Sequence, residues 1–224
     1  MSAYGFHKYM KIALSLIAIV LFIVTANAQS RTISKRKYEK AFEFAVSKTN
    51  DDYPVVLKVT TFFIENGKRV RKVTEVIESE SLLRFRITRT TVAGGRTTKQ
   101  YQVSVGFAKV FCSDDGVSWK SSEGECYPSV SSYGTHPRSL KRSVTVKWVK
   151  GKKFKVYREY SVLPEWEGNN PKIFRETVST MDSRGFFRTV VNTEGTLRPR
   201  EVTLIRKQSW ITKARIKPIV QPIE

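Results

Sequence analysis

VVLKVTTFFIENGKRVRKVTEVIE, residues 55–78, carries the clearest structural signal in this chain. Residues 55–65 are rich in β-branched and aromatic side chains, which favour strands. They end at Asn66-Gly67, a dipeptide that strongly signals a tight hairpin turn. Residues 68–78 return with a similar composition. The stretch therefore predicts two antiparallel strands joined by a two-residue turn.

Strand patterns of this kind continue to residue 211. In one of them Leu83, Phe85 and Ile87 alternate with arginine and threonine, as a strand with one buried face requires. Short turns separate the runs, and together they predict an antiparallel meander of about nine strands. A segment rich in Ser, Gly and Pro at 121–142 is the longest expected loop, and the residues after 215 form an expected extended tail.

A helix is predicted ahead of the strands, at residues 34–48. Tyr38, Phe42 and Ala45 recur at spacings of three and four, with Lys and Glu between them. Ser34 is a candidate N-cap for this helix. The predicted fold class is mainly β (α+β), a curled antiparallel meander or half-barrel with one N-terminal amphipathic helix against it. Such a sheet must curl round the helix or close on itself, because an antiparallel sheet needs one buried face.

The first 28 residues have the three parts of a secretory signal peptide. Lys8 and Lys11 precede an apolar run at 12–24, which is followed by Ala26-Asn27-Ala28. A membrane anchor is the alternative, but crossing a bilayer takes about 20 apolar residues and this run is shorter. We expect cleavage near Ala28, a periplasmic or extracellular location without a transmembrane anchor in the mature chain, and one domain at 29–224.

The charge of the chain points to anionic partners. Lys and Arg number 40 against 20 Asp and Glu, and the predicted signal contains two lysines and no acid, which leaves +18 on the mature chain. Such an excess attracts anions without determining a fold. Outside the cytoplasm the candidates are anionic envelope components, among them lipid headgroups and acidic glycans, or an acidic protein face. Export makes nucleic acid an unlikely partner, and a basic surface without any dedicated partner is the remaining alternative.

Two cysteines, Cys112 and Cys126, remain in the predicted mature chain. An oxidising compartment permits them to form a disulfide, which would close a loop of about 15 residues and stabilise the fold by about 3 kcal/mol. A zinc site is the alternative, but two cysteines without flanking histidines supply too few ligands. We therefore expect a disulfide and no metal or cofactor.

Catalytic motifs are scarce. His136 is the one histidine after the predicted signal, so it is the only imidazole that could activate a nucleophile. The acidic pairs Asp51-Asp52 and Asp114-Asp115 stand where turn residues belong. A weak hydrolase that uses two carboxylates stays an alternative, since two such groups suffice for glycoside hydrolysis. The sequence predicts a protein that is not an enzyme.

Aromatic and aliphatic residues occur on both parities of several expected strands. On one interpretation they fill the core between the sheet and the helix. On the other, a curled sheet retains an apolar hollow for an acyl chain, as larger barrels do. The candidate lining residues are Phe63, Phe85, Ile87, Trp148 and Phe154.

Two segments resemble parts of a known family. Residues 111–119, FCSDDGVSW, are similar to a short displayed strand pair of the bacterial outer-membrane lipoprotein carrier superfamily and its sensor relatives. Residues 173–185, IFRETVSTMDSRG, resemble a late strand and turn of the same proteins. A signal peptide, a leading amphipathic helix and long hairpins also follow that order of elements. The resemblance implies an unclosed half-barrel with the helix on its concave side, holding a lipid or acyl group.

These observations lead to two functional hypotheses. The first is an exported non-enzymatic binding protein that buries an acyl chain against strand aromatics, with Arg84, Arg86 and Lys147 meeting an anionic headgroup. Their parity places these three residues on the opposite side from Phe85 and Trp148. The alternative is a basic interaction module that binds an anionic envelope polymer or a partner protein.

Overall fold

The computed structural model describes residues 30–50, 52–106, 109–122, 126–127, 138–163, 173–197 and 200–223. In chain order its elements are β1 (Arg31–Thr32), α2 (Lys35–Asn50), β2 (Val55–Glu65), β3 (Lys68–Ser79), β4 (Arg84–Ala93), β5 (Arg96–Val105), β6 (Val110–Ser113), β7 (Lys120–Ser122), β8 (Arg138–Val149), β9 (Lys152–Leu163), β10 (Ile173–Asp182), β11 (Phe187–Leu197) and β12 (Arg200–Thr212). The mainly β prediction with one helix is confirmed for these residues. The predicted signal peptide and His136 lie outside them.

The sheet contains twelve strands, so the prediction of about nine was too low. Nine strands have ten to thirteen residues each. The other three, β1, β6 and β7, have two to four residues. A run that short cannot display the two-residue alternation by which a strand is recognised. β1 and β7 exist because they pair with the longer strand or hairpin partner beside them.

The strands form two antiparallel meanders that meet in the middle of the sheet. Their order is β1-β8-β9-β10-β11-β12-β2-β3-β4-β5-β6-β7. β2 to β7 therefore run from the centre to one edge, and β8 to β12 run from the other edge back to the centre, where β12 pairs with β2. The predicted turn at Asn66-Gly67 is present, with both residues at positive φ. The sheet remains open, because its two edges do not pair.

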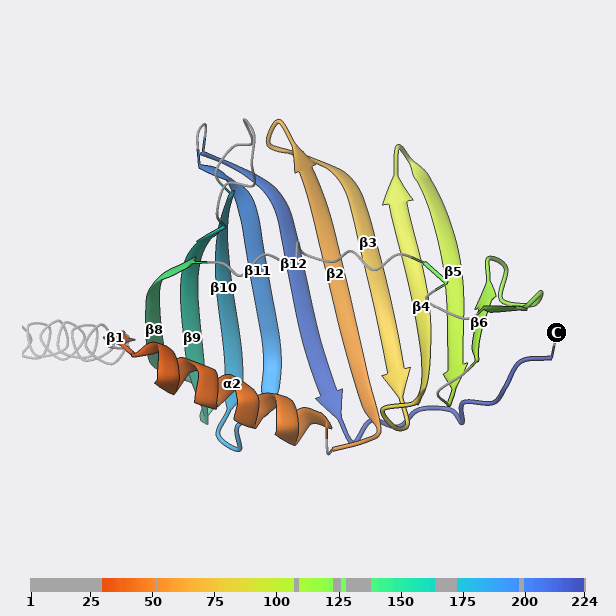
Figure 1. The fold of residues 1–224 in the computed structure, drawn as a ribbon, viewed down its shortest axis with the longest axis horizontal. Coiled ribbons are helices and arrows are strands. Elements are labelled where there is room, and N and C mark those ends of the chain that lie inside the picture. Colours follow the sequence, from red (N-terminus) through yellow and green to blue (C-terminus); the bar gives the residue numbers. More distant parts are fainter. Residues whose placement is uncertain are drawn as a thin grey trace, which may run out of the picture.

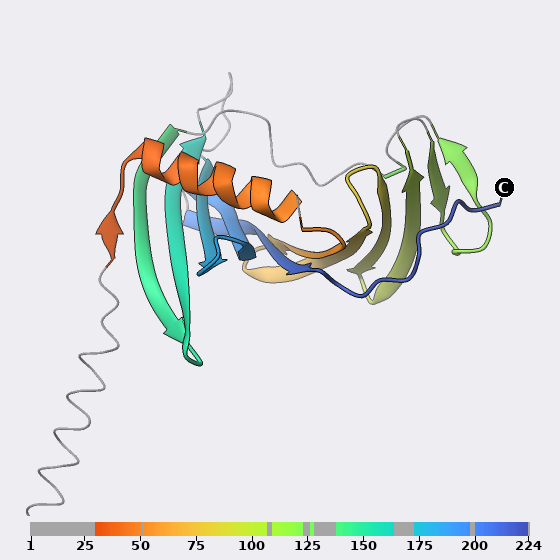
Figure 2. The same cartoon turned by 90° about the horizontal axis from the view of Figure 1, so that it is seen from below.

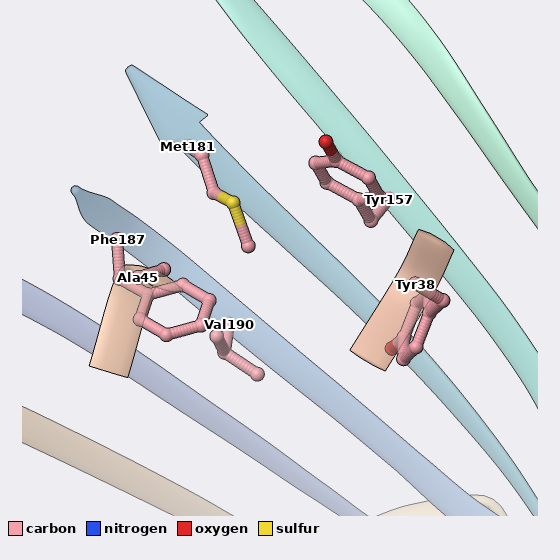
Figure 3. Close-up of a cluster of buried hydrophobic side chains, with 6 residues drawn as sticks. All are labelled: Tyr38, Ala45, Tyr157, Met181, Phe187 and Val190. Carbon is pink, nitrogen blue, oxygen red and sulfur yellow. The ribbon is translucent and has the colours of Figure 1, made fainter. Parts of the chain in front are cut away.

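The open sheet is strongly bent, and α2 lies on its inner side over the half formed by β8 to β12 (Figures 1 and 2). The helix begins as predicted, since the hydroxyl of Ser34 accepts a hydrogen bond of 3.4 Å from the backbone N–H of Lys37. One face of α2 is buried through Tyr38 and Ala45. Figure 3 shows these two residues against the main hydrophobic cluster of the sheet, which consists of Tyr157, Met181, Phe187 and Val190.

The register of the strands defines which side chains share this inner face. Tyr157 on β9 packs on the helix and pairs with Ser179, which pairs with Val190. The same row continues through Val59 on β2 to Glu75 on β3. Successive side chains of a strand point to opposite faces, so residues two positions along from these also face inward.

The C-terminal tail covers one end of the outer face of the other half. It leaves β12 and passes beneath β3, β4 and β5 (Figure 2). Ile219 in this tail is 2% exposed. Its backbone N–H donates to a carboxylate oxygen of Glu80 at 2.8 Å, and its carbonyl accepts from Arg84 at 3.4 Å. The tail is therefore a fixed part of the fold, although it has no regular secondary structure.

Candidate functional site

An apolar row on the inner face runs beyond the reach of α2. Trp210 on β12 packs against the helix-covered cluster. It pairs with Leu57 on β2, which pairs with Ile77 on β3, and Ile77 pairs with Ile87 on β4. Leu57, Ile77, Ile87 and the adjacent Phe85 are only partly buried. The row therefore continues from the covered half onto a half whose apolar side chains keep part of their surface accessible.

Six charged residues on the inner face form three ion pairs across neighbouring strands. The pairs are Arg142–Glu159 at 2.9 Å, Arg175–Glu194 at 2.7 Å and Arg89–Glu75 at 2.7 Å. Each side chain is between 10% and 21% exposed. Charges this deeply placed are tolerated because each has an opposite partner directly across the ladder. These arginines are therefore neutralised within the protein.

The Arg89–Glu75 pair borders the accessible part of the apolar row. Glu75 and Arg89 lie two residues along from Ile77 and Ile87, on the same face. Both Nε and Nη2 of Arg89 donate to the same carboxylate oxygen of Glu75, at 2.9 and 2.7 Å. A polar group whose geometry is fixed by two hydrogen bonds therefore lies beside the row, on the next inward-facing positions of β3 and β4.

The disulfide positions an aromatic side chain over this pair. Cys112 and Cys126 are bonded, as predicted, with 5.6 Å between their Cα atoms. The next residue, Tyr127, places its ring 5.6 Å from the Arg89 guanidinium. Its hydroxyl is 3.0 Å from the carbonyl oxygen of Ser113, to which it donates, and 3.2 Å from a carboxylate oxygen of Asp114. Burial and the charge of Asp114 raise the pKa of Tyr127, so it is a neutral phenol at physiological pH.

The neighbouring acidic pair has a structural role. Asp115 accepts hydrogen bonds from the backbone N–H groups of Val117 and Ser118 at 2.7 and 2.8 Å, and from the hydroxyl of Ser113 at 2.8 Å. These bonds lower its pKa far below the usual range. Such a carboxylate holds the turn between β6 and β7 and stays ionised, which supports the interpretation as turn chemistry.

The predicted lining residues lie in three different places. Phe85 and Ile87 belong to the accessible part of the inner row. Phe63 shares the inner face but lies at the far end of β2, beneath the guanidinium of Arg71 at 3.7 Å. Trp148 is 68% exposed at the tip of β8, and Phe154 pairs with Lys147 on the outer face. Leu57 and Ile77 were not predicted from the sequence, because each follows a valine and shows no clear alternation with polar residues.

The predicted anion-contacting residues do not form one site. Arg84 and Arg86 lie on the outer face of β4, where Arg86 forms a bidentate pair with Glu78 and Arg84 reaches Glu80 at 3.9 Å. The hydrogen bonds that Arg86 donates to the carboxylate of Glu78 raise the pKa of Arg86, although burial opposes this shift. Lys147 lies on β8, with six strands between it and β4 in the sheet. Their predicted parity, opposite to Phe85, is present.

The comparisons with known proteins leave the assignment of function to this geometry. No family model, curated protein or solved structure matches the chain. Among the described residues no helix has the length and apolar character needed to cross a membrane. In that same part of the chain no three His, Cys, Asp or Glu side chains are grouped to hold a metal ion.

Proposed function

We propose that this is an exported, non-enzymatic binding protein that holds a lipid or acyl group on the inner face of a half-barrel. The observation that carries the proposal is the continuation of the apolar row through Leu57, Ile77 and Ile87 past the end of the helix cover. These side chains are partly buried, so a ligand would remove further apolar surface from water. Each methylene of an acyl chain buried there contributes about 0.8 kcal/mol.

The residues beside the polar end of such a ligand differ from those that the sequence predicted. Two residues along β3 and β4, the row is bordered by the Glu75–Arg89 pair and the phenol of Tyr127. Neutral hydrogen-bonding groups fit this border, because Arg89 is already engaged by Glu75. We therefore place an ester, amide or hydroxyl of the ligand beside Tyr127.

Binding of a fluorescent fatty-acid probe tests the proposal. The variant Ile87→Ser removes apolar surface from the inner row, and we expect roughly tenfold weaker binding because burial of such a side chain contributes about 1.5–3 kcal/mol. Val92→Ser on the outer face of the same strand is the matched control, since Val92 is 39% exposed. Native mass spectrometry of protein from its own compartment should show a co-purified lipid. Equal affinity of the two variants would contradict the proposal.

The second candidate function is a basic interaction module for an anionic polymer. The observation in its favour is the group of exposed lysines at the turn between β8 and β9, among them Lys147, Lys150 and Lys152. Polymer binding would weaken steeply with salt, because it releases counterions in proportion to the number of contacted charges. Acyl binding on the inner face would change little over the same range.

A further inference from the structure

The β8–β9 hairpin ends in a projecting tip. Its sequence, KWVKGKKF at residues 147–154, turns at Lys150 and Gly151, which both have positive φ. Figure 2 shows this turn extending beyond the ends of the neighbouring strands. A side chain at this position can reach an external surface before the rest of the sheet does.

The tip exposes large apolar side chains. Trp148 is 68% exposed and the adjacent Val149 is 51% exposed. A tryptophan combines a large apolar ring with one N–H donor, and the headgroup region of a bilayer suits both parts. Two exposed apolar neighbours at the end of a projecting hairpin therefore favour an interfacial environment over water.

Cations surround this apolar pair. Five lysines follow one another along the hairpin, all exposed: Lys147, Lys150, Lys152, Lys153 and Lys155. No acidic residue occurs between residues 143 and 158. The field around the tip is therefore positive, and lysines near an anionic bilayer are attracted to it additively.

The neighbouring β10–β11 turn extends the same surface. An open basin of about 900 Å³ lies between the two turns, with Trp148 and Phe154 among its walls. Lys152, Lys153, Arg184 and Arg188 also line it, against one acid, Asp182. That acid is paired with Arg188 at 2.7 Å and Arg184 at 3.7 Å, so the lining as a whole keeps an excess of positive charge, to which Lys152 and Lys153 contribute.

We propose that these two turns are a docking surface for an anionic lipid bilayer. Trp148 and Val149 enter the headgroup region, and the lysines around the basin contact lipid phosphates. Apolar and cationic side chains together fit a lipid surface better than a polyanion, which requires charge alone. The proposal goes beyond the acyl site, because it uses a different region of the sheet and does not require a ligand there.

Vesicle co-sedimentation of the mature protein tests this inference. Vesicles of phosphatidylcholine with phosphatidylglycerol should bind the protein, and vesicles of phosphatidylcholine alone should not. Trp148→Ala should weaken binding roughly tenfold, from the loss of a buried aromatic group. Lys152→Gln and Lys153→Gln should each weaken it about fivefold.

Matched controls lie on the other half of the sheet. Leu82→Ala removes a side chain that is 71% exposed, and Lys68→Gln with Lys99→Gln removes two exposed lysines. These variants should keep nearly the full affinity if the tip is the docking surface. The proposal would be overturned if the control variants lost as much vesicle affinity as the tip variants. It would also be overturned if Trp148→Ala kept full affinity and a soluble polyanion displaced the protein from the vesicles. The fatty-acid affinity of Trp148→Ala should stay unchanged, which separates failure here from failure of the acyl site.

Discussion

The two halves of this sheet are built from the same kind of long antiparallel strands but are covered on opposite faces. On β8 to β12 the helix α2 covers the inner face, and its contacts create the main hydrophobic cluster. On β3 to β5 the C-terminal tail covers one end of the outer face, and on the inner face Tyr127 covers only the polar Arg89–Glu75 pair. The position of the cover, more than the strand sequences, therefore determines where apolar surface remains accessible.

Removing core aromatic contacts should give the largest difference between the halves. Phe187→Ala deletes the ring of a residue that is 5% exposed. The centroid of this ring lies 5.2 Å from that of Phe42 and 5.5 Å from that of Trp210. We expect a loss of about 3–5 kcal/mol in the free energy of unfolding, measured with urea. Ile87→Ala on the accessible half should cost clearly less, because Ile87 is only partly buried. Similar losses would mean that the second half is also tightly covered on its inner face.

Removing the disulfide should affect the second half alone. Replacement of Cys112 and Cys126 by serine opens a loop with a sequence separation of 14, for which we expect a loss of about 3 kcal/mol. Hydrogen exchange should accelerate in β5 and β6, beside the bond, and stay slow in β9 and β10. Faster exchange throughout the sheet would show that the halves unfold as one unit.

Truncating the buried side chain that holds the tail on the sheet should have an intermediate effect on stability. Ile219→Ala should cost about 2 kcal/mol, the lower end for buried aliphatic truncations, because its neighbours Pro218 and Val220 are exposed and can fill part of the space. Beneath the tail, the outer face of β4 and β5 retains a hollow of about 280 Å³ lined by Val103, Trp119 and Ile219. Val220→Ala is the control, since Val220 is 72% exposed. Limited proteolysis should cut the Ile219 variant faster than the control, and equal rates would contradict a fixed tail.

The smallest predicted effect concerns the carboxylate of Asp182, in the helix-covered half of the sheet. Burial alone would raise the pKa of Asp182, but hydrogen bonds from Arg188 and from the backbone N–H groups of Phe186 and Arg184 outweigh it and lower the pKa. This carboxylate therefore stabilises the fold above its unfolded pKa of about 3.9, and the contribution disappears as the pH falls through the lower folded value.

Asp182→Asn measures this contribution directly. The variant should lose about 1 kcal/mol at neutral pH, from the charged hydrogen bonds to Arg188. The difference from the wild type should shrink as the pH falls below about 4. A difference that is constant down to the acid transition would exclude the carboxylate charge as its source.

Local patterns in the sequence predicted most of the helix and strands. They did not predict which strands pair over long distances in the sequence. The Asn66-Gly67 turn, the Ser34 cap and the Cys112–Cys126 bond each involve residues close together in the sequence, so they could be predicted. The pairing of β12 with β2 could not, because alternation fixes which face a side chain takes but not which strand lies beside it.

The candidate site shows the same limit. Phe85 and Ile87 were identified because their own strand alternates clearly. Leu57 and Ile77 join them only through the register of β2 and β3, which no local pattern specifies. Trp148 was expected in a lining because it is aromatic, but its place two residues before a turn leaves it at a projecting tip.

The central pairing of β2 with β12 has a consequence for how the chain folds. Leu204 pairs with Phe63, so the central ladder joins residues about 140 positions apart. Closing so long a loop slows folding, because the entropy of closure is lost before the contacts form. Until β12 arrives, β2 presents an unpaired, apolar edge to other chains. We therefore expect chains truncated before residue 200 to aggregate, and the complete chain to fold slowly as two preformed meanders that join last.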